Sequence, residues 1–588
     1  MLKVFKNLKI RDIFFILICA GLVFVQVWLD LTMPDYTQKL TQAVSAGTVD
    51  MGKVLENGGM MLLCAVGSMT AAIFCGFFAA QVAANFARTL RERLFGHILK
   101  FSNAEINRFS TPSLITRTTN DVVQLQMLIA MGLQMMIKAP VTAVWAIVKI
   151  SNSSVEWTTA VLICVGIIVF TVSMLVMLAY PRFKSIQKLT DSLNDVTREN
   201  ISGVRVVRAF NAEKYQEKKF DNVNKAITEN HLFTSRLMGL MMPVMMTVMN
   251  GMTLAIYWIG VYLINNAEIA GRAELIGNMT AFTQYAMQVV GAFMMLVMIF
   301  IIMPRTFVSA KRINEVLETE PTVDYKSESI KTSGQGRIEF KNVSFAYADS
   351  GNPCLKNISF EINSGETFAI IGATGTGKST LVNLISRYYD VTDGEILIDG
   401  VNIKDYPEEQ LEGIVSVAPQ KATLFSGDIK SNITYGCKDD IPDDDCRIKR
   451  CLEISKSDFV ENLADGIHAK VAQGGTNYSG GQKQRLSIAR AVFKNAEIMI
   501  FDDTFSALDY KTDMLVRKSI REELSDTTVI IVAQRIGTIR NADKILVLHD
   551  GEIAGIGRHD ELMESCGIYR EIALSQLSAE ELSGKESA

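Results

Sequence analysis

Six long stretches almost free of charged residues dominate the first half of the chain. A helix needs about 20 apolar residues to cross about 30 Å of hydrocarbon, and each stretch reaches or approaches that length. They are Ile13–Leu29, Gly58–Phe86, Val122–Val148, Trp157–Tyr180, Leu237–Ala267 and Leu275–Pro304. The pattern is incompatible with an ordinary water-soluble globule and predicts six membrane-spanning helices in contact with the lipid bilayer.

The distribution of Lys and Arg between these stretches predicts how the chain is oriented. The N-terminal segment and the two long connectors, 87–121 and 181–236, carry 21 such residues, whereas the three alternate loops carry four. Because basic loops stay in the cytoplasm, we expect the N-terminus and both connectors there, in a multi-pass protein of the cell membrane. Periodic apolar positions in the connectors predict helices that continue beyond the bilayer, joined by short crosswise segments. Plain solvated loops are the alternative.

Beyond the last stretch, a charged helix (Ala310–Glu320) and a polar linker lead into alternating strands and helices. We therefore predict an all-α six-helix membrane domain over 1–310, a linker over 311–336, an α/β domain over 337–577 and a polar tail over 578–588. The net charge of −4 argues against nucleic-acid binding, which usually requires a basic excess.

The clearest chemical motif is the segment Gly-Ala-Thr-Gly-Thr-Gly-Lys-Ser at 372–379, which follows the apolar strand Thr367–Ile371. In this strand-to-helix context the pattern predicts a P-loop, although a chance match in a glycine-rich loop is the alternative. Backbone amides would surround the β-phosphate, the lysine would reach the β and γ oxygens, and the serine would offer its hydroxyl to Mg²⁺. The predicted ATP ligands are Gly372, Gly375, Gly377, Lys378, Ser379 and Thr380.

Two further segments extend this phosphate chemistry. The apolar strand Ile498–Phe501 ends in Asp502 and Asp503, and a carboxylate at such a strand end beside a P-loop usually holds Mg²⁺. Asp502 is the predicted metal residue, with a plain turn as the alternative. Ser479–Gln482, Ser-Gly-Gly-Gln, precedes an expected helix over Lys483–Asn495 and forms a second candidate anion site. Its alternative is a glycine turn with an ordinary helix cap.

Taken together, these motifs resemble the ATP-binding cassette (ABC) exporters, in which six transmembrane helices are fused to one nucleotide-binding domain with a helical subdomain. The similarity extends over nearly the whole chain. It includes Arg117–Asp121 after the first connector, Glu199–Phe210 in the second, and Ser506–Asp509 after the Asp502 strand. The resemblance implies that two such halves dimerise, with ATP and Mg²⁺ held between the P-loop of one half and the signature of the other.

The same resemblance assigns roles to several residues. It implies that Tyr347 stacks on adenine and that Gln420 joins Mg²⁺ and senses the γ-phosphate. The signature residues Ser479, Gly480, Gly481 and Gln482 would act in trans, and Asp509 would cross the dimer interface. Without the resemblance, Tyr347 would be read as a core aromatic and Gln420 as a surface residue after a turn.

The chain departs from the family pattern at the catalytic positions. Asp503 stands where the family usually has the Glu that polarises water, and Gln534 stands where it has the switch His. Gln473 replaces a frequent Glu, and Tyr478 replaces the usual Leu of the signature. A shorter carboxylate has less reach as a general base, and an amide cannot become cationic. We therefore predict a chain that binds ATP well, hydrolyses it slowly at its own site, and pairs with a different half-transporter subunit in a heterodimer.

The transported substrate is expected to be an amphipathic drug, lipid or peptide. Lys138 lies inside the third stretch and is a candidate substrate contact, although an interhelical pair or snorkelling would also explain it. Two other interpretations remain open: a homodimeric exporter or lipid flippase with slow ATPase, and a regulatory membrane protein gated by nucleotide. The sequence leaves the direction of transport undecided.

Overall fold

A computed structural model of the protein describes residues 9–45, 50–151, 155–266, 268–326, 328–332, 334–348, 350–436 and 445–576. The predicted tail, 578–588, lies outside these residues. The chain forms two compact units, and each is described by itself. The first, the helical unit, comprises Met1–Ile98 and Pro112–Thr319; the second, the ATPase unit, comprises Leu99–Thr111 and Glu320–Ala588.

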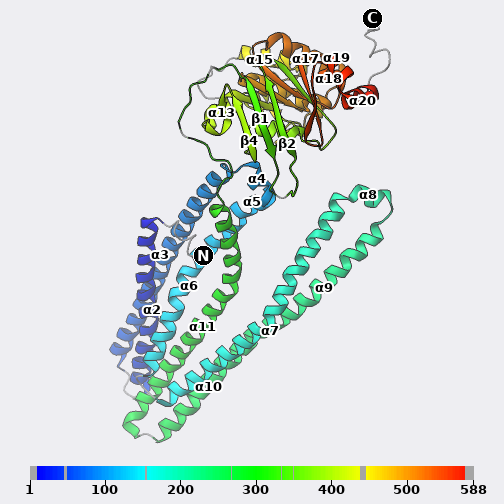
Figure 1. Ribbon diagram of the computed structural model, residues 1–588. Coiled ribbons are helices and arrows are strands. Elements are labelled where there is room, and N and C mark those ends of the chain that lie inside the picture. Colours follow the sequence, from blue (N-terminus) through cyan, green and yellow to red (C-terminus); the bar gives the residue numbers. More distant parts are fainter. Residues whose placement is uncertain are drawn as a thin grey trace. The chain divides into compact units, whose positions relative to one another are not determined.

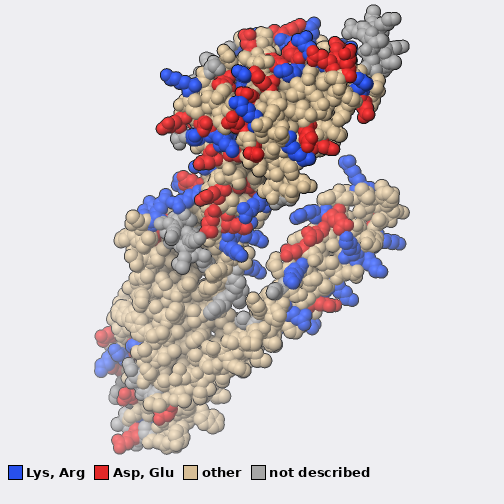
Figure 2. Space-filling model, in the orientation of Figure 1, with Lys and Arg blue, Asp and Glu red and all other residues tan. Residues whose placement is uncertain are grey.

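The helical unit consists of long helices joined by short turns (Figure 1). Six helical stretches among the described residues are long and apolar enough to cross a membrane, which confirms the six predicted spans. Figure 2 shows a broad region of this unit almost free of Lys, Arg, Asp and Glu. The helices are α2 Ile10–Ser45, α3 Met51–Ile98, α5 Thr111–Thr118, α6 Asn120–Ser151, α7 Val155–Ser202, α8 Val204–Ala209, α9 Glu213–Gly239, α10 Met241–Asn266 and α11 Ile269–Glu318.

Several helices extend well beyond the predicted spans. In both connectors the long helices end at a short one, α4 (Asn103–Phe109) in the first and α8 in the second, so the predicted helical extensions with short joining segments are confirmed. The last span and the charged helix after it are a single helix, α11, that continues to Glu318. The periodic apolar positions of these segments therefore belong to continuous helices rather than to solvated loops.

The ATPase unit includes more of the chain than its sheets. Helix α4 belongs to it, and the Asn107 amide on this helix donates to the Tyr389 hydroxyl at 3.2 Å. The linker clusters with it as well. Arg387 Nη2 donates to the backbone oxygen of Asp324 at 2.7 Å, and Gln410 Nε2 donates to that of Ile330 at 2.7 Å. The polar residues after α11 thus lie bound to the surface of this unit.

Two sheets form the centre of the ATPase unit. One has the strand order β2-β1-β4-β5 and is antiparallel; the other has the order β12-β11-β3-β10-β9-β6 and is parallel except for β12. A short pair, β7 and β8, lies apart from both. The strands are β1 Ile338–Phe345, β2 Leu355–Ile362, β3 Thr367–Ile371, β4 Asp393–Ile398, β5 Val401–Asn402, β6 Val415–Ala418, β7 Gly427–Asp428, β8 Lys470–Val471, β9 Ile498–Asp502, β10 Thr528–Val532, β11 Lys544–His549 and β12 Glu552–Gly557.

Helices surround these sheets. Side chains alternate along β3, so that Phe368 and Ile370 belong to the core shared with the antiparallel sheet, while Ala369 and Ile371 belong to the core on the opposite face. The parallel sheet is therefore buried on both faces, as expected for an α/β domain. The helices are α12 Lys378–Ile385, α13 Glu408–Ile414, α14 Ile429–Ile433, α15 Asp445–Ile454, α16 Gly480–Lys494, α17 Tyr510–Glu523, α18 Ile536–Ile539, α19 His559–Ser565 and α20 Gly567–Gln576.

Candidate ATP-binding and catalytic site

Four loops converge at the carboxyl edge of the parallel sheet. The P-loop follows β3, Gln420 follows β6, Asp503 follows β9 and Gln534 follows β10. Because these strands run parallel, their carboxyl ends meet at one edge, which is where open α/β sheets bind ligands. Residues that are up to about 160 positions apart in the chain are thereby brought together.

The glycines of the P-loop occupy positions that larger residues would not fit. A Cβ atom on Gly372 would lie 2.3 Å from the backbone oxygen of Leu548, so the loop passes directly against β11. Gly377 precedes α12 with a left-handed φ of 101°, which favours glycine. The loop therefore presents its backbone amides at the start of a helix, the geometry that favours bound phosphate.

Lys378 lies almost fully buried at the base of this loop. Its Nζ donates to the backbone oxygens of Gly372 and Ala373, both at 2.8 Å. Burial lowers the pKa of Lys378, while the carboxylates of Asp503 and Asp502 act in the opposite direction. Among the described residues, the hydrogen-bond partners of this ammonium group are these two backbone oxygens of the P-loop itself.

Asp502 and Ser379 form the predicted metal-binding pair. Ser379 Oγ donates to Asp502 Oδ1 at 3.3 Å. Burial raises the pKa of Asp502, and its hydrogen bond from Ser379 lowers it in part. Among the described residues, no group of three or more His, Cys, Asp or Glu side chains could hold a metal alone. Mg²⁺ commonly binds through one or two protein groups, substrate phosphates and water, so this pair fits an ion that arrives with ATP.

The predicted adenine contact, Tyr347, lies against the first turn of α12. The hydroxyls of Tyr347 and Thr380 are 2.9 Å apart and hydrogen-bonded. The ring of Tyr347 is half-buried and meets the rings of Phe345 and Tyr389 edge-on, with centroids 4.8 and 5.4 Å away. These contacts fix the orientation of Tyr347 beside α12.

Asp503 joins two glutamine side chains, Gln420 and Gln534, in one cluster. Its Oδ2 accepts hydrogen bonds from Gln420 Nε2 at 3.1 Å and from Gln534 Nε2 at 2.9 Å. The backbone of Asp503 is left-handed, with φ of 47°, and its amide donates to the Val532 oxygen at 3.0 Å. The side chain is only 9% exposed. One carboxylate oxygen is thus occupied by two amide donors.

A cavity of about 290 Å³ lies next to this cluster. It is lined by Asp503, Phe505, Ser506, Val532, Ala533, Gln534, Arg535 and Thr538. Ser506 Oγ donates to the backbone oxygen of Asp503 at 2.8 Å, which helps to hold the residue in its unusual conformation. The segment after β10 therefore has free space on one side.

The signature forms a separate site. Ser479 caps α16: its Oγ accepts from Gln482 N at 3.3 Å, and Gln482 Oε1 accepts from Ser479 N at 2.9 Å. A Cβ on Gly480 would meet nothing within 4 Å, so this helix start is open. In the described part of the chain, the hydrogen bonds of these residues do not reach the P-loop.

Asp509, the predicted interface residue, caps the 14-residue α17. The hydrogen bond from the backbone amide of Thr512 lowers the pKa of Asp509.

Comparisons with known proteins agree with this arrangement. Residues 13–293 match the model of the ABC transporter transmembrane region, and 355–506 match that of the ABC transporter ATPase. An uncharacterised ABC transporter ATP-binding protein of Mycobacterium tuberculosis is 37% identical over 90% of this chain and 90% of its own. The chain belongs to the ABC transporter family. It is a multi-pass membrane protein with a cytoplasmic ATPase domain. The match to the ABC ATPase model indicates that the protein uses ATP to drive transport.

Two further similarities concern relatives and fold. A multidrug resistance ABC transporter ATP-binding and permease protein of Lactococcus lactis is 30% identical over 98% of this chain and 95% of its own. The structure of a bacterial Atm1-family ABC exporter with ATP bound covers 97% of this chain and 98% of its own, with a TM-score of 0.77 and 24% identity. At that identity the likeness establishes the exporter fold alone.

In the membrane half of this ABC transporter, Lys138 forms an interhelical ion pair. Its Nζ on α6 lies 3.1 Å from Asp30 Oδ2 on α2, and Asp30 also accepts from Ser68 on α3. The backbone oxygen of Asp30 accepts from Gln288 on α11 at 2.9 Å. Sequence reasoning missed Asp30 because the first span was ended at Leu29, whereas α2 continues to Ser45. The charge of Lys138 is therefore compensated within the chain.

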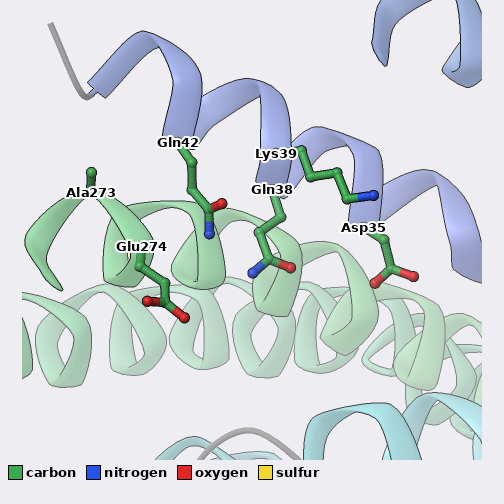
Figure 3. Close-up of a pocket in the computed structure, with 6 residues that line it drawn as sticks. All are labelled: Asp35, Gln38, Lys39, Gln42, Ala273 and Glu274. Atoms are coloured by element: carbon green, nitrogen blue, oxygen red, sulfur yellow. The ribbon is translucent and has the colours of Figure 1, made fainter. Parts of the chain in front are cut away.

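A polar pocket of about 580 Å³ lies between the ends of α2 and α11, toward the outer side of the membrane unit. Figure 3 shows Asp35, Gln38 and Gln42 of α2 pointing toward α11, while Lys39 extends along α2. Its lining residues are Asp35, Gln38, Lys39, Gln42, Ala273 and Glu274. Asp35 accepts from Tyr285 and pairs with Lys149 at 2.7 Å, so polar contacts tie α2 to α6 and α11 here.

Proposed function

We propose that this chain is one subunit of an ABC exporter whose own ATP site is degenerate, and that its signature completes the active site of a different partner subunit. The observation that supports this most strongly is the Gln420–Asp503–Gln534 cluster. All the predicted ATP-binding groups are present, whereas the position of the base and that of the switch residue are both altered.

The chemistry of the cluster explains slow hydrolysis. An attacking water needs a carboxylate within about 2.6–3.2 Å, and Asp503 is shorter than Glu by one methylene. Its Oδ2 already accepts from two amides at 3.1 and 2.9 Å, which disperses the negative charge that would attract a proton. Gln534 can donate a hydrogen bond to a γ-phosphate but cannot offer a positive charge as the phosphoryl group leaves.

The phosphates and Mg²⁺ would be held mainly by groups other than Asp503 and Gln534. The P-loop amides, the nearly buried Lys378 and the Ser379–Asp502 pair would hold the phosphates and Mg²⁺, and Tyr347 would stack on adenine. The Mg²⁺ would neutralise phosphate charge, and Gln420 would join it. A bound triphosphate would therefore stay long at this site.

The signature would act on the partner's nucleotide. Ser479, at the start of α16, offers a hydroxyl, and Gly480 leaves open space beside it. The positive end of the dipole of this 15-residue helix lies at the same helix start. Asp509, at the start of α17, would lie at the dimer interface. Since Ser479–Gln482 keep the family pattern, the partner's composite site would be the faster one.

The substrate we propose is an amphipathic drug, lipid or peptide; a drug is favoured by the similarity to the lactococcal relative, which is named for multidrug resistance. Lys138 is a weaker candidate for contacting the substrate than the sequence alone indicates, because Asp30 neutralises the charge of its side chain. We propose instead that the pair joins α2 to α6 and that the polar outer pocket lies on the release side.

Co-expression with a second half-transporter tests the assembly. We expect an affinity tag on this chain to recover a mixed dimer, and that dimer to transport a fluorescent amphipathic dye in inside-out vesicles with added ATP. A fully active dimer of this chain alone would contradict the heterodimer. Nucleotide-gated behaviour without ATP-dependent uptake would contradict the exporter.

A further inference from the structure

The last described helix, α20, reaches the segment that carries Gln534. Gln576 Nε2 donates to the backbone oxygen of Gln534 at 2.8 Å, and Gln576 Oε1 accepts from the backbone amide of Ile536 at 2.9 Å. One side chain thus spans the turn between β10 and α18. Both of its hydrogen bonds go to backbone atoms, so they constrain the path of the main chain.

A second anchor holds the far side of the same segment. Arg517 on α17 donates to the backbone oxygens of Gly537 and Thr538 at 3.2 and 3.0 Å. The buried Asp513 holds the guanidinium through a 2.6 Å contact. The end of α18 is therefore fixed by Arg517, and the start of the segment by the backbone hydrogen bond from Ala533 to Ile370 at 3.1 Å. Between these two points, Gln576 supplies the hydrogen bonds to the main chain at Gln534 and Ile536.

Packing holds the residues on either side of the turn, because Ala533 and Ile536 are buried, but it does not enclose Gln534 itself. The 290 Å³ cavity borders Gln534, Arg535 and Thr538, and it has room for several water molecules at about 30 Å³ each. Gln534 is exposed, and its amide has the single Asp503 contact at 2.9 Å. If the backbone at Gln534 were released, its side chain would have space to turn away from the site.

We propose that Gln576 is a positioning residue of the ATP site: by spanning the Gln534–Ile536 turn it holds the Gln534 amide beside Asp503, where it also faces the γ-phosphate of bound ATP. The proposal rests on the proposed function, in which ATP is retained at this site. Loss of the two hydrogen bonds shortens the retention of ATP about three- to tenfold, since each contributes modestly.

The test measures how long ATP stays on this chain. The full-length protein in its purified dimer is loaded with radiolabelled ATP and chased with unlabelled ATP, and the label remaining is assigned to each subunit after photo-cross-linking. We expect Gln576→Ala to shorten the lifetime three- to tenfold without changing the melting temperature or the ATP concentration for half-maximal initial binding. Ser575→Ala, on the same helix turn, serves as the matched control and should behave as the unaltered protein.

A double-mutant cycle separates positioning from general stability. Gln534→Ala should shorten the lifetime similarly, and the double variant should add little, because both act through the same amide. A normal lifetime in Gln576→Ala with a shortened one in Gln534→Ala would overturn the inference and leave the proposed function intact. Additive effects, or a lowered melting temperature with weaker initial binding, would overturn it in favour of a structural role. If the unaltered protein retains no ATP, the proposed function fails instead.

Discussion

Lengthening the carboxylate at position 503 should speed up hydrolysis at the site that we propose to be slow. The Asp503→Glu substitution inserts one methylene, which extends the carboxylate by about 1.5 Å. Asp503 Oδ2 now lies 2.9 and 3.1 Å from the two amide nitrogens of Gln534 and Gln420, so a carboxylate longer by one methylene cannot keep both contacts unchanged. A displacement of this size decides whether a base lies within hydrogen-bond reach of a water.

The expected gain follows from that geometry. A well-placed general base contributes about 10²–10⁴-fold, and restoring part of it should raise turnover at this site about 10²-fold, equivalent to about 2.7 kcal/mol. Adding Gln534→His supplies a group that can become cationic and should raise turnover further, by about tenfold. ATP affinity should change less than about threefold, because the P-loop contacts are untouched.

The assay is phosphate release from lipid-reconstituted dimers in which the other composite site has been inactivated. Asp503→Asn is the matched control: it keeps the size and removes the charge, and should change turnover less than about threefold. The reasoning would be refuted if Asp503→Asn abolished turnover, because Asp503 would then already be an effective base. It would also be refuted if Asp503→Glu bound ATP normally and remained slow.

Three other consequences can be measured. Lys138→Met leaves the charge of Asp30 uncompensated at a site where both side chains are about 22% exposed, so it should destabilise the protein by about 3 kcal/mol. Adding Asp30→Asn should recover most of the lost melting temperature. Additive losses in the double variant would contradict a stabilising ion pair. Burial and the nearby Arg540 lower the pKa of His559, so on acidification the unfolded chain binds a proton at this group before the folded chain does. The melting temperature of the ATPase domain should therefore decrease as the pH is lowered through about 6.5. His559→Gln should make the melting temperature less dependent on pH in this range. Ser479→Ala should lower dimer turnover at least about tenfold while labelled ATP still binds this chain's own P-loop, whereas loss of that binding would show a cap defect alone.

Local signals in the sequence predict which loops meet at the carboxyl edge of the parallel sheet. The P-loop, Asp502 and Gln534 each follow an apolar strand, and parallel strands necessarily bring their carboxyl ends to one edge. The six spans were equally predictable, since bilayer thickness fixes the length of an apolar run. In these cases the determining physics acts over a few neighbouring residues.

Features that depend on distant partners were not predictable. Asp30 looked like the first residue of an outer loop, because nothing nearby shows that Lys138, 108 positions later, lies opposite. The same holds for Gln576, whose partner Gln534 is 42 residues earlier, and for the linker, which Arg387 holds at Asp324. Residue spacing predicts which residues share a helix face or a sheet edge. The contacts named here instead depend on how helices and loops pack against one another in three dimensions.

Trapping nucleotide during transport tests the central claim most directly. The dimer of this chain and its partner is allowed to cycle with photoreactive radiolabelled ATP, and the nucleotide cross-linked to each subunit is then identified. We expect intact triphosphate on the P-loop of this chain after many turnovers, and diphosphate on the other. Diphosphate appearing on this chain as fast as transport proceeds, and disappearing in Asp503→Asn, would contradict the account.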